Sequence, residues 1–170
     1  LDKVSAVIVG EAVGAAASFA TTFGAQTGLA IIPILCFGTP AQKQKYLPRI
    51  VSGEMIGAYC LSESVSGSDA LGARAHATRQ PDGSWRLSGE KLWITNGLES
   101  EVFLVFANVD RSKGYKGITA FVVDSELDGG GCCEQLLVVE EFVAVQIGRD
   151  VTLAVVHQQV GRITGVVGDR

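Results

Sequence analysis

The chain has 170 residues, of which 47% are hydrophobic, and a formal net charge of -4. This length is sufficient for one buried core, shared between a helical part and a strand part. The mild acidity and the lack of any Lys/Arg run argue against nucleic-acid binding, because such proteins present a basic face to the phosphates. The four cysteines and two histidines have no spacing that suits metal ligands, so no metal site is expected.

The first 49 residues predict helices. The Ala-rich segment Glu11–Phe19 favours a helix. A second helix is predicted over 41–50, because Thr39 suits the N-cap and Pro40 the first helical position. Pro48 is expected to end or kink that helix.

Residues 12–42 contain no charged side chain and are numerous enough to cross a bilayer. The stretch is nevertheless built from Gly, Ala, Ser, Thr and Gln as well as Ile and Leu, and it contains Pro33. Lipid-facing helices seldom hold so many hydroxyl and amide groups without partners. We therefore expect a buried helix pair that packs through small residues, and no membrane span.

From Met55 the hydrophobic period becomes strand-like. Strong turn signals occur at Gln80–Ser84 and at Asn96-Gly97. Short strands at this spacing predict a small antiparallel sandwich or barrel, and the order of helices before strands indicates an α+β fold. The predicted strands are Ile56–Leu61, Ala73–Arg79, Trp85–Leu87, Lys91–Thr95, Val102–Ala107, Ile118–Val123, Leu137–Val145 and Val151–Val156.

Two segments contain residues suited to cofactor binding. In Tyr59–Asp69 a strand end leads into a Ser/Gly loop, whose N–H groups and hydroxyls suit a phosphate or a heteroaromatic edge. Such a loop is also typical of an ordinary connection. On a strand, Trp93 and Thr95 would point to one face, where an indole and a hydroxyl could flank a planar cofactor. The alternative is a core tryptophan and an ordinary strand threonine.

Taken together, Tyr59–Asp69 and Trp93–Thr95 resemble the acyl-CoA dehydrogenase family. There, a C-[LIV]-[ST]-E-x-x-x-G-S-D stretch and a W-I-[TS] stretch flank the flavin in the middle β-domain. The resemblance covers about residues 1–124, and its later part is similar to the short/branched-chain type. Further matching pieces are Gly38–Lys43, Lys45–Pro48, Ser52–Glu54, Ser88–Lys91, Gly114–Thr119 and Phe121–Asp124.

The resemblance implies three parts. Residues 1–54 would belong to the N-terminal helical domain and 55–124 to the flavin-contacting middle β-domain. Residues 125–170 form an unassigned tail with two candidate strands, and the chain is expected to be truncated before the family's C-terminal helical bundle. A shifted reading frame or an artificial junction near Ser125 would explain the loss of correspondence.

The resemblance also implies FAD as the cofactor and assigns roles to individual residues. The hydroxyl of Ser62 would hydrogen-bond the isoalloxazine, Trp93 would stack beside the ring, and Thr95 would donate to flavin N5. Ser68 and Tyr115 are the expected substrate contacts. No catalytic residue is assigned, because the family's catalytic Glu belongs to the bundle. The expected cofactor-binding residues are Tyr59, Cys60, Leu61, Ser62, Ser68, Trp93, Ile94 and Thr95.

The activity implied is α,β-desaturation of an acyl-CoA thioester, with electrons passing to an electron-transfer flavoprotein. The full-length enzyme would be a homo-oligomer in the bacterial cytoplasm or the mitochondrial matrix. The alternative is a non-catalytic remnant that turns over no substrate. The motifs distinguish neither a dehydrogenase from an oxidase nor one acyl chain length from another.

Overall fold

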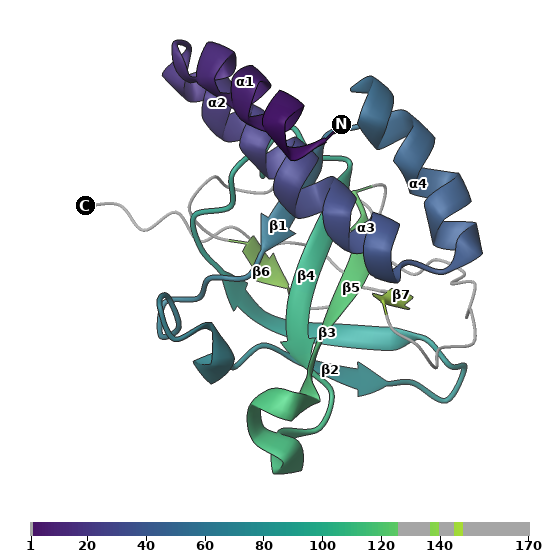
Figure 1. Cartoon of the computed structure of the whole chain (residues 1–170). Helices are drawn as coiled ribbons and strands as arrows, with labels where there is room; N and C mark the ends of the chain where they lie inside the picture. Colours follow the sequence, from purple (N-terminus) through teal and green to yellow (C-terminus); the bar gives the residue numbers. More distant parts are fainter. Residues whose placement is uncertain (1, 126–136, 140–144, 148–170) are drawn as a thin grey trace.

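A computed structural model describes residues 2–125, 137–139 and 145–147 of the chain. Its helices precede its strands, which confirms the α+β class (Figure 1). The helical elements are α1 (Lys3–Gly14), α2 (Ala17–Gly24), the π-helix η1 (Ala25–Ala30), α3 (Ile31–Phe37) and α4 (Pro40–Ser52). The strands and 3-10 turns are β1 (Gly57–Cys60), η2 (Ala70–Gly72), β2 (His76–Arg79), β3 (Trp85–Lys91), β4 (Val102–Asn108), η3 (Arg111–Gly117), β5 (Ile118–Asp124), β6 (Leu137–Val139) and β7 (Val145–Ile147).

Helix α4 begins with the cap that the sequence predicts. The Thr39 hydroxyl oxygen accepts from the Gln42 backbone N–H at 3.2 Å, and the Gln42 side-chain oxygen accepts from the Thr39 N–H at 2.8 Å. This reciprocal capping box satisfies two donors that the helix itself leaves free. Pro40 occupies the first turn, where its missing N–H costs nothing.

Pro48 does not end α4, contrary to one of the two predicted outcomes, because the helix continues to Ser52. A proline removes one backbone hydrogen bond, but Tyr46 and Ile50 on either side of it are buried against the sheet. Their burial holds the helix in place across the missing bond. The helix closes instead at Gly53, whose φ of 79° lies in the left-handed region that favours glycine.

Replacement of Thr39 by Ala is expected to lower the free energy of unfolding by about 1 kcal/mol, because the Gln42 N–H loses its acceptor. Urea denaturation followed by tryptophan fluorescence measures this loss. Gln44→Ala, at an exposed position inside the same helix, serves as the control and should change stability by only a few tenths of a kcal/mol. Equal effects of the two substitutions would contradict the capping role.

The sheet is mixed and not purely antiparallel as expected. Strand β4 pairs antiparallel with β5 but parallel with β1, where Gly57 lies opposite Val102, and with β2 at its far end, where His76 lies opposite Asn108. The chain leaves β1, forms the antiparallel β2–β3 hairpin and returns to start β4 beside the start of β1. Parallel neighbours require such a long crossover connection, which the spacing of short strands could not reveal.

Two strands predicted beyond Asp124 have different outcomes. The predicted strand 137–145 contains β6, which pairs with β3. It ends at Val145, where β7 begins, and β7 pairs with β5. The second predicted strand, Val151–Val156, lies outside the described residues.

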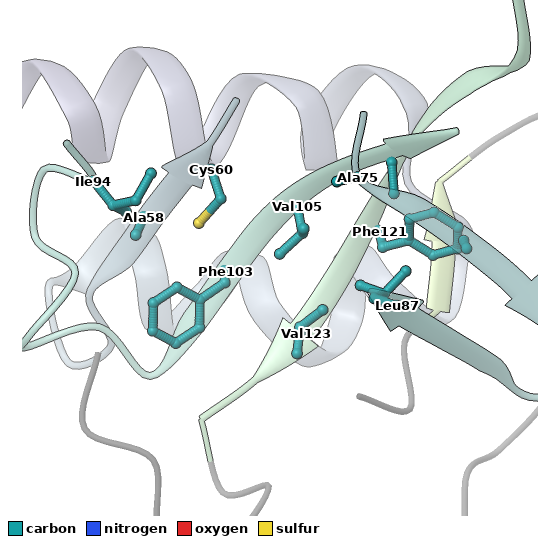
Figure 2. Close-up of a cluster of buried hydrophobic side chains, with 11 residues drawn as sticks. Ala58, Cys60, Ala75, Leu87, Ile94, Phe103, Val105, Phe121 and Val123 are labelled. Carbon is teal, nitrogen blue, oxygen red and sulfur yellow. The ribbon is translucent and has the colours of Figure 1, made fainter. Parts of the chain in front are cut away.

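Strand β4 separates two layers of core. Val102 and Leu104 pack with helix residues, including Ile34 of α3, on one face of the sheet. On the other face, Phe103 and Val105 pack with residues of β1, β3 and β5 (Figure 2). The alternation follows from the period of two in a strand. Both faces of β4 are therefore covered, which explains its almost unbroken burial.

The charge-free N-terminal stretch is less buried than the sequence analysis expects. Helices α1 and α2 have no buried residue, whereas Ala25, Ala30 and Ile34 further along are buried beside the sheet. In the part of the chain that the structure describes, Ala17–Phe37 is long and apolar enough to cross a membrane by length and composition, with 17% of the window buried. A helix that packs on a protein core passes the same test, and Figure 1 shows this helical run lying across β1, β4 and β5.

Gln26, within the π-helix, joins the helices to the sheet. Its side-chain nitrogen donates to the carbonyls of Ile50 at 2.9 Å and Met55 at 2.8 Å, and its oxygen accepts from the Gly57 N–H at 2.8 Å. The helix also approaches β1 closely, because a Cβ at Gly57 would lie 2.5 Å from the Cβ of Ala30. The start of β1 is thus fixed against the helical layer.

Candidate functional site

The two segments singled out in the sequence lie side by side. The Leu92 N–H donates to the Ser62 carbonyl at 2.9 Å, and the Lys91 ammonium donates to the Leu61 carbonyl at 3.0 Å. The end of β1 and the end of β3 are therefore held together at the residues that precede the loop and the tryptophan. This adjacency is the geometry that a shared cofactor site requires.

The prediction of a strand over Lys91–Thr95 is wrong. Strand β3 ends at Lys91, and the backbone turns away from the sheet with φ of 54° at Trp93 and 66° at Asn96. Asparagine adopts the left-handed region readily, but a tryptophan there is strained by about 1–3 kcal/mol. Strain of this kind persists only where the surroundings impose it, and here the neighbouring Ile94 is buried in the core (Figure 2). The Trp93 side chain, by contrast, is 75% exposed.

Asn96 ties this turn to the helices. Its side-chain nitrogen donates to the carbonyls of Thr22 in α2 at 3.4 Å and Gly57 in β1 at 3.3 Å. The turn and α2 border an open cavity of about 680 Å³, within the roughly 300–1,000 Å³ typical of ligand pockets. Its lining residues are Ser18, Thr21, Thr22, Ile56, Trp93, Ile94, Thr95, Asn96 and Glu99.

The cavity brings together some of the expected site residues. Trp93 and Thr95 both line it, although they do so from a turn and not from one face of a strand. Leu61 and Ser62 are half-buried beside this turn but are not among the lining residues. Ile94 also borders the cavity, yet its side chain is 2% exposed and belongs to the core. The residue as a whole is therefore almost closed to a ligand.

The side chains of Tyr59 and Cys60 point to opposite faces of the sheet. Cys60 is fully buried in the core with Phe103, so it presents no exposed surface to a cofactor (Figure 2). Tyr59 packs on Phe106 with ring centroids 4.9 Å apart. Burial raises the pKa of the Tyr59 phenol, so the side chain is neutral at physiological pH.

Neither of the two expected substrate residues lines the cavity. Ser68 is exposed on the loop that follows β1. Tyr115 is 55% exposed in η3, which follows the last residue of β4, whereas the turn around Trp93 precedes the first residue of that strand. The structure therefore separates Tyr115 from Trp93 by the length of β4.

A buried ion pair lies directly beneath the two segments. The Lys91 ammonium is 2.7 Å from a Glu63 carboxylate oxygen, and the two side chains are only 1% and 3% exposed. The same carboxylate accepts from the backbone N–H groups of Arg74 at 2.6 Å and Ala75 at 3.0 Å. The pair thus joins β3, the loop after β1 and the entry to β2.

Burial and hydrogen bonding oppose each other at Glu63. Desolvation alone would raise its pKa, but the hydrogen bonds from Lys91, Arg74 and Ala75 outweigh burial and hold the pKa below its ordinary value. Burial also lowers the pKa of Lys91, and the contact with Glu63 opposes that effect. The carboxylate form of Glu63 is therefore the form that the fold stabilises.

A second contact joins the same two segments at the surface. The Ser64 hydroxyl donates to the Glu90 carboxylate. Because neighbouring residues on a strand point to opposite faces, Glu90 meets Ser64 outside while Lys91 meets Glu63 inside. This hydrogen bond restrains the loop at Ser64.

Glu63, Lys91 and Asn96 were not predicted from the sequence as determinants of the site. Glu63 and Lys91 occurred within the quoted motifs, but a charged residue is normally expected at the surface. In the sequence, Asn96-Gly97 indicates only a turn. The side-chain amide that anchors the turn to α2 gives no separate signal in one sequence.

The arrangement is that of an α+β protein with a ligand-sized cavity at the junction of its helices and sheet. Sequence profiles described as the acyl-CoA dehydrogenase N-terminal domain and the acyl-CoA dehydrogenase middle domain match residues 1–54 and 58–136, respectively. The chain belongs to the acyl-CoA dehydrogenase family. The match continues past Ser125, so the correspondence ends later than the motifs indicate.

Relatives and solved structures agree with this membership. The chain is 45% identical over 130 residues to a probable acyl-CoA dehydrogenase of Bacillus subtilis, covering 76% of this chain and 21% of the relative. It is 52% identical over 93 residues to a probable short/branched chain specific acyl-CoA dehydrogenase of Dictyostelium discoideum, covering 55% of this chain and 22% of the relative. The structure of an acyl-CoA dehydrogenase from Bacillus anthracis complexed with FAD has a TM-score of 0.77 and 36% identity, with coverage of 88% and 28%.

Proposed function

We propose that this chain forms the flavin-facing part of an FAD-dependent acyl-CoA dehydrogenase. The observation that carries the proposal is the exposed side chain of Trp93, whose backbone lies in the left-handed region. Together with Thr95 it borders a ligand-sized cavity. A large indole left open to solvent at a strained backbone position suits stacking on a planar ring. The FAD in the structurally similar Bacillus anthracis enzyme supports the same cofactor here.

In this proposal the residues of the chain bind and orient. Trp93 lies beside the isoalloxazine, and the hydroxyls of Thr95 and Ser62 hydrogen-bond it, with Thr95 directed to N5. Cys60 and Ile94 are buried, so they would support the site through their packing in the adjoining core. FAD, when bound, supplies the redox chemistry by accepting a hydride from the β-carbon of an acyl-CoA thioester. The chain supplies a fixed position for that chemistry and shields one side of it from water.

The chain spans 21% and 22% of the lengths of the two curated relatives described above, so the activity of a complete enzyme is a proposal. We infer an acyl-CoA substrate of the short or branched type, electron transfer to an electron-transfer flavoprotein, and homo-oligomer formation by the complete enzyme. Ser68 would then lie near the pyrophosphate of the flavin and the acyl-CoA chain. Tyr115 would touch the substrate from η3. The compartment would be the bacterial cytoplasm or the mitochondrial matrix.

A second candidate function is a non-catalytic polypeptide that turns over no substrate. Colour and reduction separate the two candidates. Purified 170-residue protein that is yellow and bleaches anaerobically with an acyl-CoA has the full activity. We expect yellow protein that no acyl-CoA bleaches. Protein that binds no FAD would refute the flavin assignment.

Substitution of Trp93 by Ala is expected to weaken FAD binding by about tenfold or more, because stacking of a ring on an aromatic side chain contributes about 1–3 kcal/mol. Thr95→Val, which removes one hydrogen-bonding group, should weaken binding by about three- to tenfold. Quenching of flavin fluorescence on titration measures both dissociation constants.

The matched control for Thr95→Val is Thr78→Val, an exposed threonine on β2 away from the cavity. It should leave the FAD dissociation constant unchanged. If Trp93→Ala and Thr95→Val bind FAD as tightly as the parent chain, the proposed cofactor position is incorrect.

A further inference from the structure

Glu63 and Lys91 immediately adjoin the residues assigned to the flavin ring. Glu63 directly follows Ser62, and Lys91 is two residues before Trp93. They are 28 positions apart in the sequence, yet their side chains meet at 2.7 Å inside the protein. Their contact therefore ties the segment that ends at Ser62 to the segment that begins at Trp93.

The contacts of the pair are directional. Lys91 donates to the Leu61 carbonyl as well as to Glu63, so its ammonium fixes both the main chain before Ser62 and the carboxylate after it. Glu63 in turn accepts from the N–H groups of Arg74 and Ala75, which fixes its own position. Hydrogen bonds of this kind define distance and angle, whereas two apolar side chains of similar volume would pack in several ways.

Stability alone does not account for the pair. Two buried charges lose their hydration, and apolar replacements of similar volume are often as stable. The pair nevertheless lies at the one place in the described chain where the ends of β1 and β3 meet, supported by the Leu92–Ser62 backbone bond and the Ser64–Glu90 contact. These observations point to geometry as its role.

We propose that Glu63 and Lys91 are positioning residues whose buried contact sets the spacing between the Tyr59–Ser62 and Trp93–Thr95 segments, and thereby the affinity for the flavin. This inference rests on the proposed function. Neither residue touches the ring. Each acts through the main chain that it holds: Lys91 through the Leu61 carbonyl and the start of the turn, and Glu63 through the loop that begins at its own position.

The decisive variant is Glu63→Leu combined with Lys91→Met, which removes both charges together. We expect it to fold, because no uncompensated charge remains inside. Amide hydrogen exchange of residues 91–96 should rise about tenfold or more, and the FAD dissociation constant should rise about tenfold, a difference well above titration error. The absorption bands of bound flavin should also lose their fine structure.

The control is Ile50→Ala in α4, which removes core contacts on the helical face of the sheet. It lowers global stability but should leave the exchange of residues 91–96 relative to the rest of the chain, and the FAD dissociation constant, within about twofold of the parent. If the double variant behaves like the parent in both measurements, the inference is overturned. If it does not fold, Glu63→Asp, which keeps the charge but shortens the side chain, is subjected to the same two measurements with the same criteria.

The two measurements also separate this inference from the proposed function. A parent chain that binds no FAD refutes the flavin assignment. Hydrogen exchange then decides the role of the pair by itself: faster exchange at residues 91–96 in the folded double variant supports positioning, and unchanged exchange refutes it.

Discussion

The free energy of unfolding is expected to fall by about 3–5 kcal/mol at neutral pH when Lys91 is replaced by Met, because the buried Glu63 carboxylate then has no opposite charge. Urea denaturation followed by tryptophan fluorescence measures this difference. Lys45→Met is the matched control, since the Lys45–Asp124 pair has side chains that are 58% and 30% exposed. An exposed pair contributes less than about 1 kcal/mol.

The effect of Lys91→Met should depend on pH. In the folded parent the pKa of Glu63 is held below its ordinary value. The carboxylate therefore contributes fully to stability at pH values above that ordinary pKa, and this stability is lost as the pH falls through the lower pKa of the folded state. A protonated Glu63 no longer requires an ammonium partner. The stability difference between Lys91→Met and the parent should therefore shrink towards about pH 3. A difference that stays constant from about pH 7 to about pH 3 would contradict this account of the pair.

Gln26→Leu should destabilise the chain by about 3 kcal/mol, because the Met55 carbonyl and the Gly57 N–H lose their side-chain partner and the Ile50 carbonyl keeps only the Gly53 N–H. A buried polar group left without a partner costs about 1–3 kcal/mol, and partial access of water reduces the sum. Thermal and urea unfolding of the purified variant measure the loss.

The same substitution at Gln80 provides the comparison for Gln26→Leu. Gln80 is part of the turn between β2 and β3, and its side chain makes one local hydrogen bond, to the Thr78 carbonyl. Gln80→Leu should change stability by less than about 0.5 kcal/mol. If Gln26→Leu is equally mild, Gln26 does not join the helices to the sheet in the way described.

Local signals were sufficient where local chemistry decides the structure. Thr39 and Pro40 predict the start of α4 because the capping contacts lie within four residues of one another. The turn at Gln80–Ser84 likewise predicts the β2–β3 hairpin. The helices-first order and the short apolar strands indicate the α+β class, which the structure confirms.

Long-range contacts account for what the sequence did not predict. The parallel pairing of β1 with β4 depends on a crossover that no short pattern encodes. The break after Lys91 is another case, since alternation of side chains favours a strand while Asn96 and the buried Ile94 impose a turn. Burial of Lys91 was also not predictable from one sequence, because its partner is 28 residues away.

The contact between Glu63 and Lys91 encloses the whole β2–β3 hairpin in a closed segment of chain, much as a covalent crosslink would. The tip of that hairpin at Gln80–Ser84 is distant from both ends of the segment, and its residues Pro81 and Asp82 are exposed. Loop-closure entropy rises only slowly with length, by about 0.6 kcal/mol per doubling. The hairpin tip is therefore a suitable place to insert a tag or reporter peptide while the geometry at residues 62 and 93 is preserved.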